Sequence, residues 1–117
     1  MSVAKDLLSK ARTPDYVCGD FAVDAWQALL RRPLDASIIS ALSSANATSF
    51  YEARDHIERL DSPKDGSFVT FWRIAGRAHV GVYFKGSIFH LAHHYAQCVP
   101  LGTLKTYYPV IRFYGVK

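Results

Sequence analysis

The sequence has few cysteines and no long apolar run. Its 117 residues include two cysteines, Cys18 and Cys98, which are too few for the disulfide framework of a small secreted domain. The segment from Met1 to Arg12 is amphipathic and charged, so we expect no secretory signal peptide. No stretch approaches the ~20 apolar residues that a membrane-spanning helix requires. The sequence therefore predicts a protein made in the cytoplasm without a signal peptide and without a membrane span.

Clusters of basic charge are also scarce. The formal net charge is +4, from 14 lysines and arginines against 10 aspartates and glutamates. Arg31 and Arg32 form an isolated adjacent pair, and there is no longer run rich in lysine and arginine. We therefore expect no nucleic-acid partner.

What the chain does have is enough apolar material for a core. Half of its residues are apolar and 14% are aromatic, unlike a disordered segment. The sequence shows no repeat, low-complexity segment or linker. We expect a single domain over residues 1–117.

The first half has helical periodicity. Apolar residues recur at intervals of three and four over 3–11 and over 18–30, and Pro33 predicts the end of the second helix. A short helix is expected over 35–42. Ser49, with Glu52 three residues later, predicts a further helix over 49–60.

The second half consists of short β-branched and aromatic segments separated by turn signals at Gly66, Gly76 and Gly86. We expect strands at 68–72, 80–84, 88–91 and 110–114. Cys98 lies in a segment that we expect to be a buried strand, where a free cysteine acts as a small apolar residue. Helices followed by an antiparallel meander predict an α+β fold, with N-terminal helices packed on an antiparallel β-sheet.

Three residues have the chemistry and the chain order of a thiol nucleophile with its base. Cys18 starts a predicted helix, where the backbone dipoles stabilise a thiolate. His79 opens a strand, and His90 closes the next strand after a tight turn at 85–87. This topology predicts the two imidazoles side by side, with His79 as base and His90 as the residue that orients it. Taken singly, each residue also fits a structural role, because a helical cysteine is more often part of a core.

A metal site is the alternative interpretation of His90, His93 and His94. Two histidines at this spacing suit zinc only on a helix or a bent loop, and no carboxylate or cysteine lies nearby in the sequence. We expect no metal and no other cofactor. Because the register of this segment is open, His93 or His94 could take the place of His90 as orienting residue.

These residues resemble the NlpC/P60 cysteine peptidases. The resemblance rests on Cys18, the turn and strand over 63–71, the segment His-Val-Gly-Val-Tyr at 79–83, and Phe89-His90. It spans roughly Tyr16 to Ala92. It implies a papain-like NlpC/P60 fold that cleaves amide bonds in peptidoglycan stem peptides. Cys18 would be the nucleophile, His79 the base and His90 the third polar residue.

The chain departs from the family around the cysteine. The usual Asp-Cys-Ser-Gly is here Val17-Cys18-Gly19-Asp20. Asp20 lies within one turn of the thiol, where it either disfavours the thiolate or caps the helix. The aromatic-glycine segment that usually precedes the cysteine is absent. Tyr16 is the candidate for the oxyanion side, and the backbone N–H of Cys18 is the other candidate.

A narrower resemblance concerns location. The short stand-alone form, the start Cys18–Ala25 and the segment 97–101 are similar to compact versions of the family found in phage tails and gene transfer agents. This resemblance implies a protein of the virion tail, with tail-tip or hub proteins as partners, acting in the periplasm or cell wall during entry. The alternative is a catalytically inactive structural or tail-assembly protein on the same fold.

Overall fold

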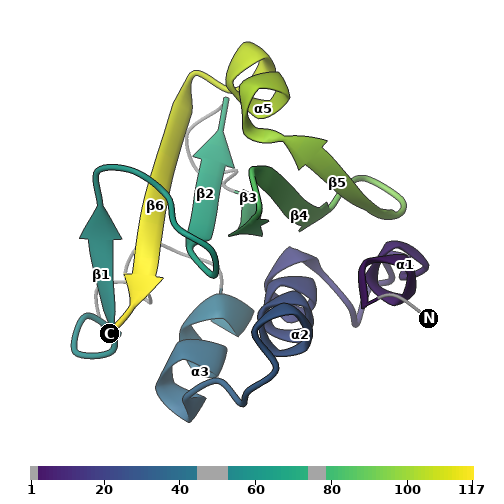
Figure 1. Ribbon diagram of the computed structural model, residues 1–117. Coiled ribbons are helices and arrows are strands. Elements are labelled where there is room, and N and C mark those ends of the chain that lie inside the picture. Colours follow the sequence, from purple (N-terminus) through teal and green to yellow (C-terminus); the bar gives the residue numbers. More distant parts are fainter. Residues whose placement is uncertain (1–2, 45–52, 74–78) are drawn as a thin grey trace.

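The computed structural model describes residues 3–44, 53–73 and 79–117, and within them helices pack against an antiparallel β-sheet (Figure 1). The sheet has six described strands in the order β1-β6-β2-β3-β4-β5, and all neighbours are antiparallel. The strands are β1 (Ile57–Leu60), β2 (Phe68–Trp72), β3 (His79–Phe84), β4 (Ser87–Leu91), β5 (Ala96–Pro100) and β6 (Val110–Val116). The predicted α+β class is confirmed.

The helices are divided between two places. They are α1 (Val3–Leu8), α2 (Cys18–Leu30), α3 (Ala36–Ser44) and α5 (Leu101–Tyr107). The first three lie together below the sheet in Figure 1, and α5 lies apart from them, between the end of β5 and the start of β6. None of the described helices is long and apolar enough to cross a membrane.

Helix α2 forms where the sequence predicts it, because its apolar positions gather on one face. Phe21, Ala22 and Ala25 are completely buried, and Trp26 is almost so. The indole Nε1 of Trp26 donates a hydrogen bond to the carbonyl oxygen of Gly66 at 2.9 Å, which ties the helix to the turn before β2. The helix ends when Arg31 adopts the left-handed conformation, with a φ of 55°.

The alternation of side chains along the strands gives the sheet two different faces. Phe68 faces α2 and stacks on Trp26, with ring centroids 6.4 Å apart. Val69 and Phe71 of the same strand belong to a second apolar cluster, which includes Leu104 of α5. We call these two sides of the sheet the α2 face and the α5 face. Because successive residues of a strand point to opposite sides, the register decides which face each functional residue occupies.

Two structural predictions made from the sequence were wrong, and one helix was not predicted. Residues 57–60 form β1 instead of the end of a helix, because their backbone pairs with β6, from Ile57 opposite Val116 to Leu60 opposite Phe113. Cys98 is exposed, because β5 is the edge strand of the sheet. Helix α5 was not predicted. Residues 49–52 and the turn at Gly76 lie outside the described residues.

Candidate catalytic site

Cys18 is the first residue of α2 and belongs to the apolar cluster between that helix and the sheet. Its side chain is buried, with 9% of the residue exposed. The carboxylate of Asp20 accepts a hydrogen bond from the backbone N–H of Val17 at 3.0 Å. The structure therefore gives Asp20 the capping role, in which its charge meets the positive end of the helix dipole.

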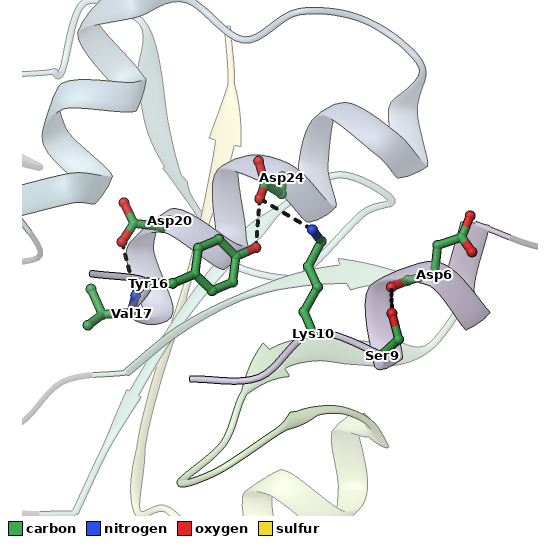
Figure 2. Close-up of polar contacts among 7 residues, drawn as sticks. All are labelled: Asp6, Ser9, Lys10, Tyr16, Val17, Asp20 and Asp24. Carbon is green, nitrogen blue, oxygen red and sulfur yellow. Dashed lines mark hydrogen bonds and ion pairs between the residues drawn. The ribbon is translucent and has the colours of Figure 1, made fainter. Parts of the chain in front are cut away.

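Tyr16 is held against the side of α2 (Figure 2). Its hydroxyl donates a hydrogen bond to Oδ2 of Asp24 at 2.6 Å, and Lys10 Nζ lies 3.9 Å from the same oxygen. Burial, and then the hydrogen bond to Asp24, raise the pKa of Tyr16 above its usual value. The hydroxyl predicted for the oxyanion side is therefore engaged with a carboxylate in this structure.

The two predicted histidines do come together, on the α5 face. His90 lies directly opposite Gly81 in the β3–β4 pair, and both imidazoles pack against Phe71. The His79 ring stacks on Phe71 with centroids 5.5 Å apart, and the His90 ring meets it edge-on at 5.3 Å. Tyr108 closes the group, 4.8 Å from Phe71 and 6.0 Å from His79.

Gly81 explains how His90 can lie so close to β3. A Cβ atom at Gly81 would lie 3.0 Å from the Cβ of His90 and 2.7 Å from the carbonyl oxygen of Phe89. Both distances are below normal van der Waals contact, so a larger residue would force the two strands apart. The glycine of the His-Val-Gly segment thus has a packing role beside the histidine pair.

Burial favours the neutral form of both histidines. Burial lowers the pKa of His90 to about 4, and the neighbouring His79 contributes to this shift. Burial also lowers the pKa of His79, with a further contribution from the Arg12 guanidinium. Arg12 Nη2 donates to the carbonyl oxygen of Leu91 at 3.4 Å, which fixes the cation near this part of the sheet. A neutral imidazole is the form that can accept a proton from a thiol.

Cys18 and His79 lie at the same end of the sheet. Before α2, the N–H of Arg12 donates to the carbonyl oxygen of His94 at 2.8 Å, in the turn that follows β4. Near its other end, α2 is bound through Trp26 to Gly66, whose N–H donates to Tyr83 in the second half of β3. Helix α2 and strand β3 therefore run in the same general direction, and their first residues share one end.

The structure does not bring the thiol to the histidines, because they occupy opposite faces. Cys18 packs on the α2 face together with Val80 and Val82. His79 is paired with Phe71 and shares its side, the α5 face. Within the described residues no hydrogen bond joins Cys18 to either imidazole.

His93 and His94 lie in the turn between β4 and β5, and both are exposed. Their rings touch each other, with centroids 4.5 Å apart. Among the described residues there is no group of three or more side chains that could hold a metal ion. Of the three clustered histidines, His90 is the one whose ring packs on Phe71 beside His79.

Sequence reasoning missed a pocket of about 380 Å³ on the α5 face, next to His90. It was missed because residues of α5 form part of its lining, and this helix was not predicted. The signal for this helix was present, since Pro100 precedes a segment in which Leu101, Leu104 and Tyr108 recur at helical spacing.

Comparisons with known proteins give no relative for this chain. No family model matches it, and no significant match is found among curated proteins or among solved structures. Its function must therefore be inferred from its own residues.

Proposed function

We propose that this chain is a cysteine peptidase or amidase with the papain-like NlpC/P60 arrangement, acting on peptidoglycan stem peptides. One observation carries the proposal: Cys18 begins α2 at the end of the sheet where His79 begins β3, with His90 beside it. A helix that starts with cysteine, followed by antiparallel strands that carry two adjacent histidines, supports this arrangement. The resemblance of these same residues to the family supplies the substrate class.

The proposed reaction is acyl transfer. His79 takes the proton of the Cys18 thiol, and the thiolate attacks the amide carbonyl. The backbone N–H groups at the start of α2, including that of Cys18, stabilise the oxyanion. His79 then protonates the leaving amine, and water hydrolyses the thioester. His90 orients His79. Each of these steps uses side chains and backbone groups of the chain and water, so the mechanism requires no cofactor or metal.

The mechanism requires a rearrangement of His79. Its imidazole must pass from the α5 face, around the end of β3, to the thiol on the α2 face. His79 is the first residue of β3, and its pairing with Phe71 is the terminal residue pair between β3 and β2. Because strand ends open more easily than strand centres, such a movement is easiest at this position. The described structure then corresponds to a resting form with nucleophile and base apart.

Hydrolysis of muropeptides tests the proposal. Wild-type protein should release new amines, whereas Cys18→Ala and His79→Ala should release none. Cys98→Ala is the matched control and should retain full activity, because Cys98 is exposed on the edge strand. Equal amine release by wild type and Cys18→Ala would end the assignment.

A second candidate is a catalytically inactive tail or assembly protein. The burial of Cys18 and its lack of a hydrogen bond to either histidine favour this candidate. Thiol reactivity separates the two, measured in Cys98→Ala so that Cys18 is the one remaining thiol. An activated Cys18 should react with iodoacetamide at a pH well below the usual thiol pKa of about 8.5. A structural Cys18 should stay unreactive at that pH.

The proposed location is a phage tail tip, with tail-tip or hub proteins as neighbours and the cell wall as the place of action. The resemblance to compact tail-associated versions of the family supports it. Immunogold labelling of purified virions should place the protein at the tail tip, and labelling of infected-cell cytoplasm alone would contradict this.

A further inference from the structure

The pocket on the α5 face has the size of a small-molecule site. Its volume of about 380 Å³ falls within the range of roughly 300–1,000 Å³ that such sites occupy. It is formed by β4, β5 and α5, together with the residue that follows β2 and the residue that follows α5. Its lining comprises Arg73, His90, Gln97, Val99, Thr103, Leu104, Tyr107 and Tyr108.

Two polar side chains stand next to each other in this pocket. His90 and Gln97 are directly opposite in the β4–β5 pair, and both line the pocket. His90 is 7% exposed, and its ring nitrogens make no hydrogen bond within the described residues. Because burial lowers its pKa to about 4, the ring is neutral at pH 7 and offers one donor and one acceptor. The buried imidazole therefore has unused hydrogen-bonding capacity.

Arg73 brings a positive charge to the same pocket. Its Nε donates a hydrogen bond to the carbonyl oxygen of Tyr107 at 3.1 Å, which orients the guanidinium. Its two terminal nitrogens make no hydrogen bond or ion pair with the rest of the described chain. None of the described residues that line the pocket is acidic. A planar guanidinium with two open nitrogens matches a carboxylate, which it can bind through both oxygens.

Apart from Thr103, the rest of the lining consists of aliphatic and aromatic residues. Val99 of β5 and Leu104 of α5 belong to the same apolar cluster and line the pocket together with Tyr107 and Tyr108. Such a lining takes a small apolar side chain rather than an inorganic anion. The ligand that fits both halves has a carboxylate, an adjacent peptide group and a compact aliphatic body.

We propose that this pocket binds the carboxyl terminus of a short peptide. Arg73 pairs with the terminal carboxylate, His90 and Gln97 hydrogen-bond to the last peptide group, and a small side chain packs on Val99 and Leu104. The pocket does not include Cys18 but shares His90 with the proposed catalytic group, so binding is measured apart from hydrolysis. A stem peptide as the source of the terminus rests on the proposed function, and the C-terminus of another protein is the other source of this chemistry.

The test is a titration of Cys18→Ala protein, which cannot hydrolyse the probe, followed by NMR. The probes are D-alanyl-D-alanine, L-alanyl-L-alanine and the C-terminal amide of each. At least one free dipeptide should shift the backbone signals of Gln97 and Thr103. Its amide should bind at least about tenfold more weakly, because the ion pair with Arg73 is lost. Arg73→Gln should weaken binding to a similar degree, and Arg59→Gln, an exposed arginine on β1 at the far edge of the sheet, should not.

The outcomes separate this inference from the proposed function. Tighter binding of the D-dipeptide supports a stem peptide as source, and tighter binding of the L-dipeptide supports a protein C-terminus. The inference is overturned if neither dipeptide shifts the pocket signals, if the amides bind equally well, or if Arg73→Gln binds like the parent protein. Failure of muropeptide cleavage by the wild type would leave the binding result standing, and the reverse also holds.

Discussion

The two faces of the sheet differ in how completely they are covered. On the α2 face, a helix of 13 residues places Phe21, Ala22 and Ala25 against the strands with no exposed surface. On the α5 face, a helix of 7 residues covers part of the sheet and leaves a pocket beside His90. The α2 face therefore supplies most of the core and fixes Cys18. The α5 face instead leaves a pocket beside His90, and its two histidines make no hydrogen bond through their rings within the described residues. The proposed catalysis depends on joining the two faces at one end of the sheet.

The largest difference between the faces should appear in cavity-forming substitutions. Phe21→Ala should lower the free energy of unfolding by about 3–5 kcal/mol, because it leaves a closed void in a packed core. Leu104→Ala should cost about 2 kcal/mol, at the lower end for a buried leucine, since the space it leaves opens into the pocket. Urea unfolding followed by tryptophan fluorescence measures both values. Equal losses would mean that the α5 face is packed as tightly as the other.

The next effect is a pH dependence that belongs to the α5 face. In the folded protein burial lowers the pKa of His90 to about 4, from 6.5. As the pH falls below about 6.5, His90 becomes protonated in the unfolded chain, whereas in the folded protein it stays neutral until about pH 4. His90 therefore contributes stability above pH 6.5 that is lost between pH 6.5 and 4, by up to about 3 kcal/mol.

His90→Gln is the control for this effect, because His79 and the carboxylates also titrate as the pH falls. The variant should lose less stability than the wild type between pH 7 and pH 4.5 in urea unfolding. A parallel decline of both proteins would show that His90 is not the group responsible.

A smaller effect concerns the contact between β3 and β4. Gly81→Ala should destabilise the protein by about 1–3 kcal/mol, because its Cβ would meet Phe89 O at 2.7 Å and His90 Cβ at 3.0 Å. Gly102→Ala in α5 is the matched control, since a Cβ there meets nothing within 4 Å. It should stabilise the protein by up to about 1 kcal/mol through helix propensity. Thermal unfolding of both variants tests the pair, and a neutral Gly81→Ala would contradict the tight approach of the strands.

The smallest effect is expected on the surface of α2. Tyr16→Phe removes the hydrogen bond to Asp24 and should cost about 1 kcal/mol, without lowering the rate of muropeptide hydrolysis. Tyr95→Phe, at an exposed tyrosine, should change neither quantity. If Tyr16→Phe strongly lowered the rate of muropeptide hydrolysis without changing stability, the Tyr16 hydroxyl would have a role in stabilising the oxyanion.

The sequence by itself determined the elements whose signals are local. The apolar spacing from Cys18 to Leu30 and the stop at Pro33 define α2, and the aromatic and β-branched runs define four of the strands. The proximity of His79 and His90 followed as well, because a tight turn between two adjacent strands leaves few registers. These features depend on neighbours within a few residues, and their periodicity can be read directly.

Only the tertiary structure decided what depends on distant partners. Ile57–Leu60 pairs as a strand because β6, more than 50 residues later, offers a free edge. Cys98 is exposed because its strand ends the sheet. The separation of Cys18 from the histidines was equally invisible, since a helix can cover either side of a sheet whose strands are known. The total apolar area buried across the whole domain determines which face of the sheet a helix covers. A local sequence pattern does not report this total.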